Sequence, residues 1–273
     1  MNRLDGKIAV VTGSTQGLGL AIARRFVNSG AAGLVTCGRS GKKGREEADR
    51  IADDTGVPVK FVAADLSRVD ECRSVVAAAE ESFGRVDVLV NAAAKTDRGN
   101  LVDTSPELFD SMFAINVRGP FFLMQEAVKL MIQNSTSGSI VNIGSMSAYS
   151  GQPFISAYCA SKGALATLTR NTGFALLHNR IRVNQLNIGW MDSEGEDAIQ
   201  RKYHGAGDGW VEEASKALPF GRLVDPEEVA RAVAFLASDD SGLMTGSVIN
   251  FDQSVWGAFE TGMPAPAGPL SAQ

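Results

Sequence analysis

Short runs of β-branched and other apolar residues alternate along this chain with longer segments of helical periodicity. Seven runs have the length of strands, at residues 7–12, 34–38, 59–63, 86–91, 138–143, 181–187 and 248–252. Between them, apolar side chains recur at helical spacing, for example at Val75, Val76, Ala79 and Phe83. Strands that alternate with helices predict an α/β fold, a doubly wound parallel sheet with helices on both faces. No internal repeat or linker divides the chain, so we expect one domain over residues 1–273.

The charges and cysteines exclude several classes of protein. The chain has 26 Lys and Arg against 31 Asp and Glu, a net charge of −5, and its basic residues are scattered. We therefore expect no nucleic acid and no anionic membrane surface as a partner. An odd number of cysteines (Cys37, Cys72 and Cys159) and the absence of an apolar run before Asp5 argue against a secreted disulfide framework. The expected location is cytoplasmic.

Residues 130–161 form a window without any Lys, Arg, Asp or Glu. The window is long enough to span a bilayer, but it holds eight serines and Pro153, which make a lipid-exposed helix costly. It is therefore expected to be buried in protein, where its hydroxyl and amide groups need hydrogen-bond partners.

A glycine-rich turn follows the first predicted strand and precedes a helix. Such a turn presents backbone N–H groups to a pyrophosphate at the helix N-terminus, although glycines also serve ordinary strand-to-helix turns. Its position after a buried strand favours a dinucleotide. The cofactor-binding residues predicted here are Gly13, Ser14, Thr15, Gln16, Gly17, Leu18 and Gly19.

The end of the second strand bears on the choice between NADP and NAD. Many dinucleotide folds place an acid there for the ribose 2′-OH of NAD, whereas this chain has Arg39 and Ser40, with Lys42 and Lys43 following. This pattern favours the 2′-phosphate of NADP, with NAD as the alternative. The other interpretation is a solvated basic helix start, partly neutralised by the glutamates after it.

Two further strand ends carry residues suited to a flat ligand. Asp65 and Leu66 follow the third strand, where the carboxylate could hold the adenine amino group or cap a helix. Asn91, Ala92 and Ala93 close the fourth strand with side chains small enough for close backbone contact. All five are predicted to line the cofactor site.

Tyr158 and Lys162 are four residues apart at the start of a helix that Pro153 and Ser156 introduce. A nearby ammonium and a helix N-terminus favour a phenolate, which a tyrosine needs in order to act as an acid or base near neutral pH. Many such pairs are only surface neighbours. Ser145 strengthens the catalytic interpretation, because it follows the fifth strand at the edge where ligands of open α/β sheets bind.

Asn116 lies four residues before Pro120 in a helix that begins near Ser105. Proline has no N–H for the carbonyl of residue i−4, so the Asn116 carbonyl is released and can hold a water. Alternatively, Pro120 only kinks the helix around the core.

The motifs at 12–19, Asn91 to Ala94, Asn116, Ser145 and Tyr158-Cys159-Ala160-Ser161-Lys162 together resemble the short-chain dehydrogenase/reductase superfamily. The resemblance implies a Rossmann domain with strand order 3-2-1-4-5-6-7, a nicotinamide cofactor and usually a homotetramer. It also implies a role for each residue: Tyr158 as catalytic acid or base, Lys162 on the nicotinamide ribose and lowering the tyrosine pKa, Ser145 on the substrate oxygen, and Asn116 anchoring a water.

The chain departs from the family pattern after the sixth strand, where it reads Ile188-Gly189-Trp190-Met191-Asp192-Ser193 in place of Pro-Gly-x-x-x-Thr. Gly189, Met191 and Ser193 are still expected to contact the cofactor. Gln16 replaces a residue that is basic in many NADP-dependent relatives, whereas Arg39 matches the other basic position.

Polar side chains surround the predicted substrate position, and tryptophans lie among them. This mixture suits a polyhydroxylated substrate, so we expect a sugar or polyol dehydrogenase. The alternatives are a 3-oxoacyl-thioester or other carbonyl reductase and, from another class, a non-catalytic nicotinamide-binding regulator. The predicted substrate-binding residues are Ser145, Ser147, Gln152, Tyr158, Asn187 and Trp190.

Two irregular segments are expected to complete the site. Residues 193–219 form a polar insertion predicted to be a substrate lid, and residues 253–273 a carboxyl-terminal arm. No metal is expected, because the two histidines, His178 and His204, have no ligand-like spacing.

Overall fold

The computed structural model describes residues 3–258 and residue 268. Seven parallel strands form one sheet in the order β3-β2-β1-β4-β5-β6-β7, which confirms the predicted topology. Every strand lies within two residues of its predicted bounds. The strands are β1 Ile8–Thr12, β2 Gly33–Gly38, β3 Val59–Ala63, β4 Val88–Asn91, β5 Ser139–Ser145, β6 Arg182–Ile188 and β7 Val248–Phe251.

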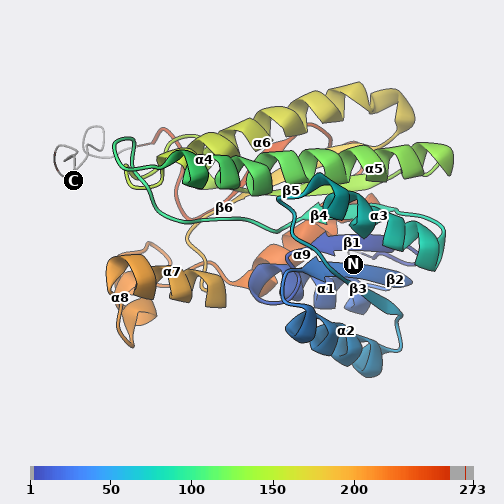
Figure 1. Cartoon of the computed structure of the whole chain (residues 1–273), viewed down its shortest axis with the longest axis horizontal. Coiled ribbons are helices and arrows are strands. Elements are labelled where there is room, and N and C mark those ends of the chain that lie inside the picture. The colour runs from blue at the N-terminus through green and yellow to red at the C-terminus, as the bar shows by residue number, and fades with distance from the viewer. Residues whose placement is uncertain (1–2, 259–267, 269–273) are drawn as a thin grey trace.

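Helices cover both faces of the sheet (Figure 1). On one face, α1 (Gly17–Asn28), α2 (Gly41–Thr55) and α9 (Pro226–Ala237) pack on a core that includes Phe26 and Val233. On the other, α3 (Val69–Phe83), α5 (Gly119–Gln133) and α6 (Ser156–Ala175) enclose a core that includes Leu89 and Met131. The β-branched residues of the inner strands β2, β1, β4, β5 and β6 are buried on both faces, as expected for a parallel sheet, whereas those of the edge strands β3 and β7 are only partly buried.

The crevice for a ligand lies where the strand order reverses, between β1 and β4. Thr12 ties the two strand ends together: its hydroxyl donates to the Val90 carbonyl and accepts from the N–H groups of Ala92 and Ala93, at 3.0 and 3.1 Å. A Cβ on Gly13 would lie 2.8 Å from the Ala93 Cα, so only glycine fits there.

The helix that contains Asn116 is interrupted rather than merely bent. It begins as α4 (Pro106–Phe113), with the Ser105 hydroxyl accepting from the Leu108 N–H, and continues as α5 after a π-helical turn at Ala114–Arg118. Pro120 supplies no N–H to the Asn116 carbonyl, and the Gly119 N–H bonds to the Ala114 carbonyl instead.

The segment 193–219 folds into two short helices, α7 (Glu194–His204) and α8 (Trp210–Lys216), which lie together beyond the end of the sheet (Figure 1). Of the segment 253–273, the structure describes only the start, where Trp256 stacks on Tyr149 with ring centroids 5.1 Å apart. Residues 259–267 and 269–273 of this predicted arm lie outside the described residues. Short helical turns occur at Met146–Ala148, Leu177–Asn179 and Asp239–Ser241.

Within residues 3–258, no helix has the length and apolar character to cross a membrane. The uncharged window 130–161 is instead divided among the end of α5, strand β5 and the start of α6.

Candidate active site

A cleft of about 1360 Å³ opens along the carboxyl ends of the strands and extends beneath α7. Most of the predicted site residues line it. They are Gly13, Thr15, Gln16, Gly17, Leu18, Gly19, Arg39, Ser40, Asp65, Leu66, Ala92, Ala93, Ser145, Ser147, Gln152, Tyr158, Lys162, Gly189, Trp190, Met191 and Ser193.

Four predicted residues do not line the cleft. Ser14 supports the glycine turn from below, with its hydroxyl donating to the Val11 carbonyl at 2.9 Å. Asn91 donates to Asn142, and Asn187 accepts from Gln185 at 2.7 Å, so both belong to a buried row of amides. For Asn187 the placement is a correction: its side chain is 0% exposed and is not brought to the substrate space.

Asn116, the fourth, clamps the loop after β4. Its Oδ1 accepts from the Lys95 N–H at 2.8 Å, and its Nδ2 donates to the Lys95 carbonyl at 2.9 Å and to the Ser161 hydroxyl at 3.0 Å. The side chain is 1% exposed, so it reaches the cleft only through the backbone that it fixes. The role of its main-chain carbonyl in holding a water stays a prediction.

Ser145, Tyr158 and Lys162 converge at the middle of the cleft. Ser145 ends β5, and its hydroxyl accepts from the Ser147 N–H at 3.1 Å, which orients it. Tyr158 and Lys162 lie one turn apart on α6, with the Lys162 Nζ 5.7 Å from the phenol ring centroid. The Ser145 hydroxyl stabilises the Tyr158 phenolate by a hydrogen bond. The predicted triad of hydroxyl, phenol and ammonium is therefore assembled at one place.

The pKa values differ from what the resemblance implies. Burial raises the pKa of Tyr158 to about 12, and the hydrogen bond with Ser145 lowers it by a smaller amount. Burial also lowers the pKa of Lys162 to about 8; its ammonium is 2% exposed and donates to the Ile143 carbonyl at 2.8 Å. Desolvation is the largest cause of both shifts, and for each group it disfavours the charged form.

The other half of the cleft has the features of a dinucleotide site. Gly13 and Gly17 have φ of +67° and +52°, and a Cβ on Gly19 would clash with the Gly13 carbonyl. The helix α1 starts at Gly17, so its free N–H groups face the turn where a pyrophosphate can approach. These residues fit a nicotinamide dinucleotide, which the glycine turn would hold at its phosphates.

Charged groups at the adenosine end also suit a phosphate. Arg39 is exposed and makes no hydrogen bond or ion pair with another described residue. Lys43 lies on the same side, where its Nζ donates to Gln16 and to Glu194, both at 3.1 Å. Asp65 serves the turn after β3: its Oδ1 accepts from the Ser67 N–H at 2.9 Å, and this bond lowers its pKa.

The substrate half contains charged residues that the sequence did not single out. Arg98 and Glu196 line the cleft, with 15% and 21% of their side chains exposed. Asp97 joins the loop after β4 to the lid, because it accepts from Tyr203 at 2.5 Å and pairs with Lys202 at 3.4 Å. No motif marks these positions; only the structure, which brings the loop after β4 and the helix α7 to the cleft that Tyr158 also lines, reveals them.

The segment after β6, where the chain departs from the family pattern, also lines the cleft. A Cβ on Gly189 would clash with the Asp252 carboxylate, so that glycine is required by close packing. Ser193 lines the cleft and also caps α7, since its hydroxyl accepts from the Glu196 N–H at 3.2 Å.

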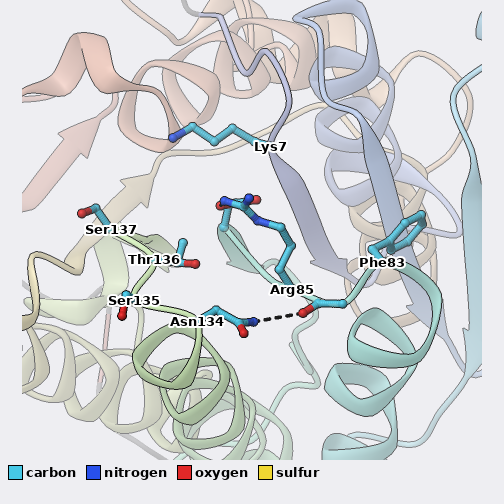
Figure 2. A pocket seen from close by; sticks show the side chains of 9 residues that line it. Lys7, Phe83, Arg85, Asn134, Ser135, Thr136 and Ser137 are labelled. Carbon is cyan, nitrogen blue, oxygen red and sulfur yellow. Dashed lines mark hydrogen bonds and ion pairs between the residues drawn. The ribbon is translucent and has the colours of Figure 1, made fainter.

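A second cavity, of about 470 Å³, lies at the amino-terminal edge of the sheet and is separate from this site (Figure 2). Its charges satisfy each other: Arg85 pairs with Asp87, and Asp87 also accepts from the Ile8 N–H at 2.8 Å. Asn134 donates to the Gly84 carbonyl across its floor, as the dashed line in Figure 2 shows. These polar side chains are therefore paired within the protein, where they link neighbouring segments of the chain.

The fold and the triad together define a dinucleotide-dependent oxidoreductase. The family described as enoyl-(acyl carrier protein) reductase matches residues 13–254 of the chain. The chain belongs to this family, within the short-chain dehydrogenase/reductase superfamily, and it is an oxidoreductase.

Similar proteins include sugar-converting enzymes and an acyl reductase. The chain is 31% identical over 258 residues to galactitol 2-dehydrogenase of Agrobacterium fabrum, which covers 93% of this chain and 99% of that enzyme. It is 32% identical to 3-oxoacyl-(acyl-carrier-protein) reductase of Thermotoga maritima, over 92% of this chain and 98% of the relative. The structure of L-sorbose reductase from Gluconobacter frateurii with NADPH and L-sorbose superposes with a TM-score of 0.87 at 26% identity, covering 95% of this chain and all of the other.

Proposed function

We propose that the protein is an NADP-dependent sugar or polyol dehydrogenase that interconverts a secondary hydroxyl and a ketone. The observation that carries this proposal is the character of the space beside Tyr158. Gln152, Arg98 and Glu196 offer hydrogen bonds there, and the ring of Trp190 provides an apolar wall, backed by Trp210 with ring centroids 5.9 Å apart. Donors and acceptors next to an aromatic face match the hydroxyls and carbon skeleton of a polyol.

The catalytic roles follow from the positions of the three central side chains. Ser145 holds the substrate oxygen, and the Tyr158 phenolate accepts the hydroxyl proton during oxidation. Lys162 fixes the ribose and orients α6 against β5 through the Ile143 carbonyl. NADP⁺, when bound, would supply the hydride acceptor. Ser147, Gln152 and Trp190 contact the remainder of the substrate, while residues 193–219 act as its lid.

Three features support NADP over NAD. Arg39 is unpaired among the described residues, Lys43 adds a second cation nearby, and the similar L-sorbose reductase was solved with NADPH. The favoured partner of Arg39 is the 2′-phosphate, since a guanidinium binds phosphate oxygens in pairs.

The assembly proposed is a homotetramer in the cytoplasm. Phe109 and Phe121 are each 44% exposed and Phe174 is 77% exposed, on the helices α4, α5 and α6 that cover one face. Exposed aromatic side chains of this kind are typical of interfaces between subunits. The three cysteines are unpaired, which suits a reducing compartment.

A substrate screen tests the proposed function. Galactitol, sorbitol, gluconate, L-sorbose, acetoacetyl thioester and an enoyl thioester are assayed with NADP(H) and with NAD(H), following absorbance at 340 nm. We expect turnover of a polyol with NADP⁺ or of a ketose with NADPH. The second candidate, a 3-oxoacyl reductase, is favoured by the Thermotoga maritima relative. Turnover confined to the 3-oxoacyl thioester would establish that candidate and overturn ours.

The variant Tyr158→Phe tests the catalytic assignment. Loss of one general acid or base typically lowers the rate by about 10²–10⁴-fold. We expect this loss in kcat with the affinity for NADPH unchanged, because the ring remains in place. A non-catalytic regulator would instead show no turnover with any substrate in the wild-type protein.

A further inference from the structure

Glu196 lies in the first turn of the lid helix α7 and lines the cleft that contains Tyr158. Its charge acts on the reacting group: burial is the main cause of the raised pKa of Tyr158, and the Glu196 carboxylate raises it further while Arg98 lowers it. Glu196 and Arg98 are therefore the two lid-side charges that face the catalytic phenol.

One oxygen of the Glu196 carboxylate is fully engaged. Its Oε1 accepts from the Trp190 Nε1 at 2.9 Å and from the Gln200 Nε2 at 2.7 Å, and Arg98 Nη2 lies 3.8 Å from it. Two donors at hydrogen-bond distance hold this side chain in one orientation. The carboxylate is thus positioned before any substrate enters.

The other oxygen, Oε2, has no hydrogen bond with any residue between 3 and 258. A carboxylate oxygen accepts strong hydrogen bonds, and leaving it without a donor in a closed site is costly. About a fifth of the side chain is exposed, within a cleft whose wall is the Trp190 ring. A hydroxyl donor from the substrate would complete this arrangement.

We propose that Glu196 is a specificity-determining residue, whose Oε2 accepts a hydrogen bond from a hydroxyl other than the one being oxidised. This proposal rests on the proposed function and names the chemical class that the lid selects: neutral polyhydroxylated substrates. The acyl chain of a 3-oxoacyl thioester and a simple alcohol carry no second hydroxyl beside the reacting carbon, so they leave this oxygen without that donor and bind less tightly. Glu196 positions the substrate and transfers no proton.

The test compares Glu196→Gln and Glu196→Ala with the wild type, using NADP⁺ and the polyol that the wild type oxidises fastest in the screen above. In Glu196→Gln the amide oxygen must face Trp190 and Gln200, so an amide donor replaces the free acceptor. We expect KM to rise about 10-fold in this variant and more in Glu196→Ala, with kcat within about 3-fold, as for loss of a charged hydrogen bond. The dissociation constant for NADPH should not change.

Glu213→Gln is the matched control, because Glu213 lies on the neighbouring helix α8, is 77% exposed, pairs with Lys216 and does not line the cleft. It should behave as wild type. An unchanged KM in both Glu196 variants would overturn the inference. A loss mainly in kcat would also overturn it, because it would indicate a role in the chemistry. Weaker binding of NADPH would overturn it as well, because it would indicate a role in the folding of the lid. If the wild type neither oxidises a polyol nor reduces a ketose, the proposed function itself fails, and that result is visible before any variant is made.

Discussion

At the scale of single residues, Lys162 shows a conflict between stability and function. Its ammonium is 2% exposed, and burial lowers its pKa from 10.5 to about 8. The unfolded chain keeps its proton up to about pH 10.5, whereas the folded chain releases it from about pH 8. The folded state is therefore disfavoured below pH 8, and the free energy of unfolding rises as the pH increases from 8 to 10.5.

Replacing Lys162 with Met should stabilise the protein and abolish its activity. Below pH 8 the buried charge costs on the order of 3 kcal/mol, and loss of the bond to the Ile143 carbonyl offsets part of the gain. We expect the free energy of unfolding in urea to increase by about 1–3 kcal/mol at pH 7. The difference should shrink by pH 10.5. A variant that is less stable than wild type at pH 7 would contradict this account.

The proposed role of Arg39 in selecting NADP is also a property of a single side chain. Its guanidinium is exposed at the adenosine end of the cleft. In Arg39→Ala, the dissociation constant for NADPH should rise about 10- to 100-fold, the range expected for losing a charged hydrogen bond, while that for NADH stays the same. Fluorescence titration measures both. Lys42→Ala is the control, since Lys42 is 89% exposed and lies outside the cleft. If Arg39→Ala weakens the binding of NADPH and NADH equally, Arg39 does not recognise the 2′-phosphate.

The sequence predicted individual residues well where a strand end fixes their position. Ser145, Tyr158 and Lys162 meet because β5 and α6 have defined starts and ends. The prediction failed for Asn187, because alternation along β6 tells which residues share a face but not which face meets the substrate. Asn187 shares its face with Gln185, and both amides lie in the buried row. Arg98 was missed because it lies on a loop, where no periodicity constrains the side chain, and Glu196 because nothing in the sequence shows which face of α7 meets the cleft.

At the scale of elements, the sequence predicted why the helix around Asn116 is disrupted, but not the form that the disruption takes. The sequence identified Pro120 as the residue that frees the Asn116 carbonyl. The structure adds that the helix accommodates the missing N–H with a π turn at Ala114–Arg118. Sequence alone could not distinguish this turn from a kink, since both follow from the same lost hydrogen bond. Asn116 is thereby placed where its amide clamps the Lys95 backbone.

The lid helix α7 is held over the cleft by Asp97. Burial opposes ionisation of this carboxyl, but hydrogen bonds from Lys95 and Tyr203 dominate and lower its pKa to about 2. The carboxylate is therefore charged throughout the pH range of ordinary assays, and the contact between loop and lid should not titrate between pH 5 and 9. Sequence analysis predicted the lid segment but could not predict this attachment, because Asp97 and Tyr203 are far apart in the chain.

Asp97→Asn should loosen α7 without removing a group from the reaction centre. We expect KM for substrate to rise several-fold and proteolysis at the glycine-containing turn between α7 and α8 to become faster. Tyr203→Phe, which removes only one of the hydrogen bonds to Asp97, should show a smaller effect in the same direction. Timed proteolysis followed by mass spectrometry measures the opening. A cleavage rate equal to wild type in both variants would show that Asp97 does not hold the lid.

At the scale of the whole molecule, the two helical layers were predictable because buried parallel strands and amphipathic helices have different sequence patterns, whereas the strand order came from the family resemblance. The position of the cleft followed from the same topology, since ligands bind where the strand order reverses. The shape of the substrate space did not follow, because it depends on how α7 and α8 fold back over the sheet. The proposed assembly of subunits is the remaining property at this scale, and the interface variants are therefore chosen on the surface of α5 and α6.

The proposed homotetramer should have a mass of four times the 28.8 kDa chain by light scattering coupled to size exclusion. In Phe121→Glu, a charge replaces an aromatic side chain that is 44% exposed on α5, and in Phe174→Glu it replaces one that is 77% exposed on α6. Burying an unpaired carboxylate at an interface is strongly unfavourable, so at least one variant should dissociate to smaller species. Asp53→Lys changes the charge of an exposed residue on α2, on the opposite face, and should leave the mass unchanged. A wild-type protein that is monomeric at micromolar concentration would refute the tetramer. If both phenylalanine variants remain tetrameric, the interface does not lie on this face.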